Sequence, residues 1–125
     1  MTNELSRLPD AELEVMQALW LIRPYPAHTA AIAAHLGRSW KAPTLLKLLS
    51  RLEERGFIKA EKEGRTNVYT PLVEREDYQR FESRSFLRRL HGGSLSSLVA
   101  ALSPDTKLTD QDVAALKRIL KGEEK

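Results

Sequence analysis

Residues 42–71 read APTLLKLLSRLEERGFIKAEKEGRTNVYTP, and this stretch decides the fold. Its first half places leucine at positions 45, 48, 49 and 52, which is the i, i+3, i+4, i+7 spacing of one helix face. Pro43 suits the first turn and Gly56 suits the end, so we predict a helix between them. The pattern then changes to loose alternation over 57–62, a turn at 63–65 and strand-forming residues at 66–70. These features predict a β-hairpin that Pro71 closes.

Upstream of this stretch the sequence predicts two more helices. Leu13, Met16 and Trp20 recur at helical spacing, which predicts a helix over about 9–22 that two nearby prolines end. Thr29 is placed to cap a second, alanine-rich helix that ends at Gly37. Three helices followed by a two-stranded hairpin predict a winged helix-turn-helix.

Downstream of the hairpin the chain again has helical patterns. We predict helices over 73 to about 90 and over 95–102, and a last helix capped by Thr109. The fold class is therefore mainly α with a small β-hairpin. We predict a winged-helix DNA-binding domain at 1–72 and a helical dimerisation domain at 73–125.

Composition excludes several classes of protein and of site. The chain has no cysteine, so disulfides, thiolate metal sites and thiol nucleophiles are excluded. Its N-terminus lacks the features of a secretory signal, and no apolar run approaches the roughly 20 residues of a membrane helix. We therefore expect a cytoplasmic protein that inserts in no membrane.

Candidate catalytic and metal-binding groups are scattered. His28, His35 and His91 have no third ligand nearby in sequence, and the serines at 94, 96 and 97 have no evident base. The acidic residues at helix starts are explained by the helix dipole; these are Glu12, Glu14, Asp110 and Asp112. We therefore predict no enzyme, no metal and no cofactor.

Positive charge is concentrated in the stretch that decides the fold. Residues 38–65 contain eight lysines and arginines against four acidic residues, whereas the chain as a whole has a net charge of only +3. On a helical projection the four leucines share one side, Pro43, Lys47 and Ser50 fall nearly opposite, and Thr44 and Arg51 lie on one flank with Leu46 on the other. Such a helix start can meet phosphates and base edges, and a basic hairpin tip beside it can meet the backbone or the minor groove. We predict duplex DNA as the partner, with contacts from Lys41, Pro43, Thr44, Leu46, Lys47, Ser50, Arg51, Lys62, Arg65 and Asn67.

The C-terminal segment is too small to enclose a core of its own. Its apolar side chains must either pack on the winged helix or meet a second copy of the chain. We favour a homodimer, because a twofold axis lets two recognition helices read two half-sites. The predicted dimerisation residues are Tyr78, Phe81, Phe86, Leu90, Leu98, Leu102, Leu116 and Ile119.

The chain resembles the penicillinase-repressor family, the repressors of β-lactamase and methicillin-resistance genes. The resemblance rests on LPDAELEVM at 8–16 with Trp20, on the recognition segment from Trp40 to Leu52, and on EERGFI at 53–58. It extends to Gly93-Ser94, to SLV at 97–99 and to Leu108-Thr109. It implies a homodimeric repressor of antibiotic-resistance genes, and relief of repression when a membrane sensor-protease system triggers cleavage.

The sequence departs from that family at three places. Lys41-Ala42 stand between the tryptophan and Pro43, where the family has serine and proline directly. Leu46 stands where well-known members carry arginine, so we expect a changed operator preference, with contact to a thymine methyl or to neighbouring side chains. The bond that family proteases cut aligns with Ala101-Leu102, which differ from the family's Asn-Phe.

Two other functions compete with repression by operator occupancy. One is a ligand-responsive repressor with a pocket near the C-terminal helices. The other is a winged helix that serves as a protein-interaction module and does not bind DNA. DNA affinity that falls steeply with salt is expected of a repressor and not of such a module.

Overall fold

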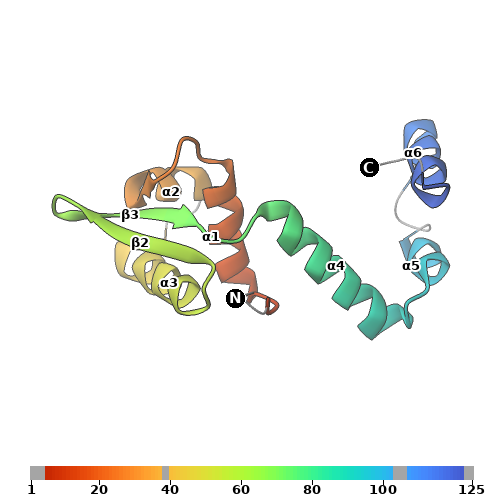
Figure 1. Ribbon diagram of the computed structural model, residues 1–125, viewed down its shortest axis with the longest axis horizontal. Helices are drawn as coiled ribbons and strands as arrows, with labels where there is room; N and C mark the ends of the chain where they lie inside the picture. Colours follow the sequence, from red (N-terminus) through yellow and green to blue (C-terminus); the bar gives the residue numbers. More distant parts are fainter. Residues whose placement is uncertain (1–4, 38–39, 103–106, 123–125) are drawn as a thin grey trace. The chain divides into compact units, whose positions relative to one another are not determined.

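The computed structural model describes residues 5–37, 40–102 and 107–122. These residues contain six helices and three strands. In chain order they are α1 (Asp10–Leu21), β1 (Ala27–His28), α2 (Thr29–Leu36), α3 (Ala42–Glu54), β2 (Ile58–Glu63), β3 (Thr66–Pro71), α4 (Arg75–His91), α5 (Leu95–Leu102) and α6 (Asp110–Leu120) (Figure 1). The chain divides into a first unit, residues 1–82, and a second unit, residues 83–125.

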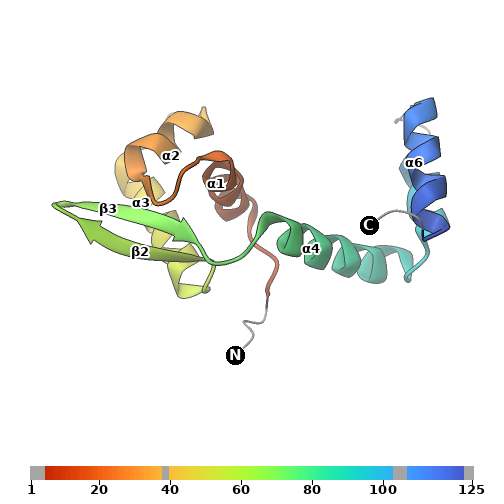
Figure 2. The same ribbon diagram turned by 45° about the horizontal axis from the view of Figure 1, so that its top comes forward.

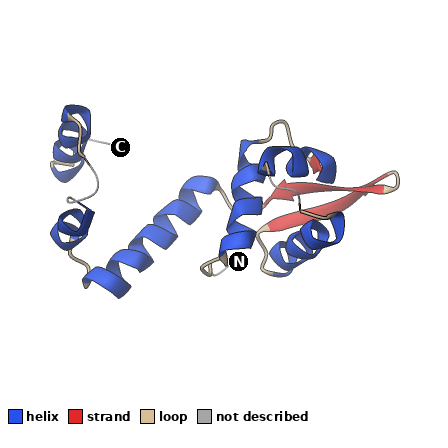
Figure 3. Cartoon of the chain, turned by 180° about the vertical axis from the view of Figure 1, so that it is seen from behind, coloured by secondary structure: helices blue, strands red, loops and turns tan. Residues whose placement is uncertain are grey.

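The first unit is a winged helix-turn-helix, as the sequence predicts. α1 contacts both α2 and α3, and the β2–β3 hairpin packs beside the three helices (Figure 3). The sheet has three antiparallel strands in the order β1-β3-β2, with Ala27 opposite Tyr69 and Lys62 opposite Asn67. β1 was not predicted from the sequence, because two residues carry no periodicity and their pairing partners lie some 40 positions along the chain.

The start of α2 differs in detail from the prediction. Thr29 is the first residue of the helix, and the N-cap position belongs to His28, whose side chain makes no cap hydrogen bond. The pairing of His28 in β1 with Val68 draws it into extended backbone and so shifts the helix start by one residue. The predicted end is confirmed, since Gly37 has the left-handed φ of 63° that favours glycine at this position.

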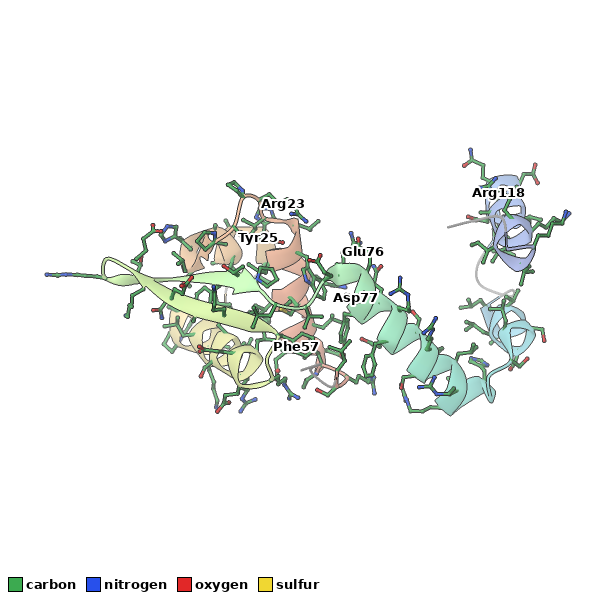
Figure 4. All side chains as sticks on the ribbon, in the orientation of Figure 1. Arg23, Tyr25, Phe57, Glu76, Asp77 and Arg118 are labelled. Atoms are coloured by element: carbon green, nitrogen blue, oxygen red, sulfur yellow. The ribbon has the colours of Figure 1, made fainter. Side chains whose placement is uncertain are left out.

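The core of the first unit combines the leucine face of α3 with apolar side chains from α1 and from the sheet. Tyr78, from the first turn of α4, completes it: its ring lies 6.0 Å from that of Trp20 and 5.6 Å from that of Phe57. Figure 4 marks Phe57, which is 1% exposed, where α3 leads into β2. The backbone N–H of Leu8 donates to the Tyr78 hydroxyl over 2.8 Å, so the N-terminal segment is fastened to the same cluster.

Glu12 does not behave as the helix-dipole explanation suggests. Although it lies in the first turn of α1, its side chain is buried in the core and accepts a hydrogen bond from Arg55, the C-cap residue of α3. A buried carboxylate needs such a partner because the interior solvates charge poorly. Sequence spacing gave no sign of this pair, whose members lie 43 positions apart.

The second unit consists of the last turns of α4 with α5 and α6. Thr109 caps α6 as predicted and forms a capping box with Asp112, and these hydrogen bonds lower the pKa of the Asp112 carboxyl. Among residues 83–102 and 107–122 no side chain is buried. None of the helices in the described ranges is both long and apolar enough to span a membrane.

Candidate nucleic-acid interface

α3 separates its apolar and polar faces as the helical projection predicts. Leu45, Leu48, Leu49 and Leu52 are all buried. The predicted contact residues of the helix and its N-cap are all exposed: Lys41, Pro43, Thr44, Leu46, Lys47, Ser50 and Arg51. A buried leucine face fixes the rotation of the helix, so its polar face is turned to solvent in one orientation.

The first turn of α3 offers fewer backbone donors than expected. Pro43 has no N–H, and the N–H groups of Thr44 and Leu45 both donate to the carbonyl of Lys41, over 3.0 and 3.2 Å. The polar groups exposed at this end of the helix are therefore mainly side chains, among them those of Lys41, Thr44 and Lys47.

The hairpin is the wing, and its tip extends beyond the helices of the first unit (Figure 2). Gly64, with a left-handed φ of 65°, and Arg65 form its turn. Lys62 and Arg65 are exposed, whereas Asn67 is half-buried. The wing therefore presents two of its three predicted contact residues fully to solvent.

Ion pairs divide the described basic residues of the stretch 38–65 into two groups. Arg55 pairs with Glu12, and Lys59 pairs with Glu61 over 3.6 Å. Within the described ranges no carboxylate pairs with the other basic side chains, which are Lys41, Lys47, Arg51, Lys62 and Arg65. All five belong to the predicted DNA-contact set, and their charge remains available to an anionic partner.

A cleft of about 520 Å³ lies between α3 and the wing. Its lining comes from three places in the sequence: the start of α2, the exposed Leu46 of α3 and the wing tip. The lining residues are His28, Thr29, Ala30, Leu46, Arg65, Thr66 and Asn67. The structure thus brings three predicted contact residues together.

The α2 side of this cleft was not predicted from the sequence. His28, which the sequence marks only as a histidine without nearby metal ligands, is exposed, and its Nε2 lies 3.2 Å from Glu63 Oε1 and its Nδ1 3.5 Å from Thr66 Oγ1. These contacts tie β1 to the wing. The signal that could have revealed them is the pairing of Ala27-His28 with Val68-Tyr69, which sequence periodicity does not encode.

The predicted dimerisation residues fall into two groups. Tyr78 is buried in the core of the first unit and Phe81 packs beside it, with the two rings 6.0 Å apart. These two residues follow the other alternative, packing on the winged helix, because Trp20 and Phe57 already provide an apolar surface for them. Tyr78 and Phe81 therefore pack within the first unit.

The remaining six residues lie in the second unit and stay accessible. They are Phe86, Leu90, Leu98, Leu102, Leu116 and Ile119. Four of them belong to α5 and α6, which enclose an apolar cleft of about 440 Å³ that is also lined by Leu95, Val99, Leu108, Asp112 and Ala115. Ala101 and Leu102, the predicted cleavage residues, are exposed in the last turn of α5.

Comparisons with known proteins agree on one family. The model of the family described as penicillinase repressor matches residues 8–122. The chain is 32% identical to the penicillinase repressor of Bacillus licheniformis, over 94% of this chain and 92% of that protein. It is 28% identical to the methicillin resistance regulatory protein MecI of Mammaliicoccus sciuri (96% and 98% covered) and 24% identical to the penicillinase repressor of Staphylococcus aureus (96% and 95% covered).

Proposed function

The chain belongs to the penicillinase repressor family and is a DNA-binding transcriptional repressor, and we propose that it occupies its operator as a homodimer joined through the second unit. The family consists of transcriptional repressors, so the chain is not an enzyme.

The proposed DNA surface rests on the cations of α3 and the wing that pair with no carboxylate of the described residues, namely Lys47, Arg51, Lys62 and Arg65. In this proposal α3 enters the major groove with its polar face, where Thr44, Lys47 and Ser50 meet base edges and phosphates. Arg65 and Lys62 follow the backbone beside the groove. The paired residues Arg55 and Lys59 are not part of the contact set.

Exposed apolar side chains of the second unit support the dimer. Leu90, Ile119 and Leu120 are 66%, 55% and 69% exposed, and no described side chain of this unit is buried. Ile119 also lines the apolar cleft between α5 and α6, and a contiguous apolar surface is characteristic of an interaction site. A second copy carries the same surface, so a twofold axis would cover both and would place two copies of α3 on one duplex.

Binding to duplex DNA tests the repressor function directly. Footprinting on DNA upstream of the chain's own gene should protect two half-sites, and log affinity should fall linearly with log salt as phosphate contacts require. A protein-interaction module would bind neither specific nor random duplex. That result would contradict the function.

Sedimentation tests the dimer separately. At micromolar concentration the full chain should sediment as a dimer in the absence of DNA. A folded monomer would contradict the dimer and would favour a ligand-responsive repressor, with the apolar cleft between α5 and α6 as the ligand site.

The proposal also has a regulatory part, which follows from the family resemblance. A protease that a membrane sensor activates would cut between Ala101 and Leu102. Cleavage there would separate α5 from α6, which together line the apolar cleft, and so would weaken the dimer and release the operator. Mass spectrometry of the chain recovered from induced cells should then find a fragment that ends at Ala101.

A further inference from the structure

Leu46 is an apolar residue on the face of α3 that otherwise carries polar and charged groups. Its side chain is 43% exposed, whereas the four other leucines of the helix are buried. It lies next to Lys47 in sequence and two positions after Thr44. On a face proposed to enter the major groove, an exposed leucine can contact an apolar group of the DNA.

The cleft beside Leu46 has the character that such a partner needs. Leu46 and Ala30 contribute purely apolar side chains to its lining, and Thr29 and Thr66 each add a methyl group. The remaining lining residues, His28, Arg65 and Asn67, have polar side chains. A mainly apolar cleft whose lining includes the cation Arg65 suits a methyl group on DNA, because the phosphates of DNA are negatively charged.

Polar contacts join the two sides of this cleft that are formed by His28 and by the wing. His28 contacts Glu63 and Thr66 on the wing, and Thr66 Oγ1 also donates to the carbonyl of Glu63 over 3.1 Å. Glu63 is thereby engaged with His28 and does not line the cleft.

We propose that Leu46 is a specificity-determining residue that contacts the 5-methyl group of a thymine, with this cleft receiving the methyl and its sugar. Thymine is the one base that presents an apolar group in the major groove, so this contact distinguishes it from cytosine and from uracil. The inference rests on the proposed function, because it needs α3 in the major groove.

Replacing thymine with deoxyuridine isolates the methyl group. A duplex is first selected from a randomised pool with the full chain, and each thymine is then replaced singly. At one or more positions the affinity should fall about fourfold, which corresponds to about 0.8 kcal/mol for one buried methyl group. With the Leu46→Ala variant, thymine and deoxyuridine at that position should bind equally.

Leu72→Ala is the matched control, because Leu72 is also an exposed leucine of the first unit but does not line the cleft. It should keep the fourfold preference for thymine. Leu46→Ala should keep the melting temperature of the parent chain, since it removes an exposed side chain. The inference is overturned if no thymine is sensitive to loss of its methyl, or if Leu46→Ala keeps the same preference at the sensitive position. A pool that yields no enriched duplex would overturn the proposed function, and this inference with it.

Discussion

Arg55 Nε lies 2.6 Å from Oε1 of Glu12, a carboxylate whose residue is only 1% exposed. The pair joins the first turn of α1 to the C-terminal cap of α3, the helix that carries the predicted DNA-contact face. Because the carboxylate is buried and the guanidinium reaches it from the helix end, the pair fixes where α3 lies against α1. The orientation of the predicted DNA-contact face thus depends on a pair that lies outside the predicted contact set.

Arg55→Ala should lower the free energy of unfolding by about 3 kcal/mol, because it leaves a buried carboxylate without its partner. Urea unfolding at one protein concentration would measure the loss. Arg80→Ala is the control: Arg80 pairs with Asp77 over 3.2 Å at the surface, and its loss should cost about 0.5 kcal/mol or less. Equal small losses in both variants would contradict a structural role for the Glu12–Arg55 pair.

Lys47→Ala and Arg65→Ala should each weaken DNA binding and reduce the slope of log affinity against log salt, by about 0.9 for each phosphate that the protein no longer neutralises. Both side chains are exposed, so the melting temperature should stay within about 1 °C of the parent value. Fluorescence anisotropy over a series of salt concentrations would give the slopes. Lys121→Ala, which removes a charge from the end of α6, should leave the slope unchanged.

Thr44→Ala should lower the ratio of specific to random DNA affinity by roughly 1 kcal/mol or more, because Thr44 is predicted to reach a base edge. Competition binding with a selected duplex and a scrambled duplex would measure the ratio. The exposed Ser83 of α4 provides a comparison, and Ser83→Ala should leave the ratio unaltered. An unchanged ratio for Thr44→Ala would mean that the recognition face has been placed wrongly.

Ile119→Asp should convert the dimer to a monomer, because a charge would have to be buried against the partner's apolar surface. Sedimentation velocity would detect the change, and specific DNA affinity should fall with it because two half-sites are no longer engaged together. Leu72→Asp is the control, since Leu72 is exposed to a similar degree, 53% against 55%, but belongs to the first unit. A dimer that tolerates Ile119→Asp would exclude α6 from the interface.

Stability should fall at high pH through Tyr78. Burial raises the pKa of the Tyr78 hydroxyl to about 12, and a hydrogen bond with Glu82 acts in the same direction. A pKa that is higher in the folded state than in the unfolded state means that Tyr78 contributes stability in full below about pH 10. That contribution is lost as the pH rises toward 12.

Urea unfolding at several pH values between 9 and 12 would test this dependence. Tyr78→Phe should be less stable than the parent chain at pH 9, because it loses the hydrogen bond from Leu8, but its stability should fall less steeply above pH 10. Parallel pH curves for the two proteins would contradict the assignment to Tyr78.

Local pattern was sufficient to predict most of the elements. The leucine spacing of α3 predicted which side chains would be buried, and the change of period after Gly56 predicted the hairpin. Thr109 was correctly predicted to cap α6. These features depend on residues within about one or two helical turns of one another, so the order of residues carries the information.

The sequence by itself therefore determined the helices, the hairpin, the polar face of α3 and the family. Only the tertiary structure decided which charges are paired: it pairs Arg55 and Lys59 with carboxylates, and among the described residues no carboxylate pairs with Lys47 or Arg65. It also placed Tyr78 in the core of the first unit and brought His28 and Leu46 to one cleft. These outcomes join residues far apart in the chain, and their physical cause is burial and charge pairing in three dimensions, which no local period records.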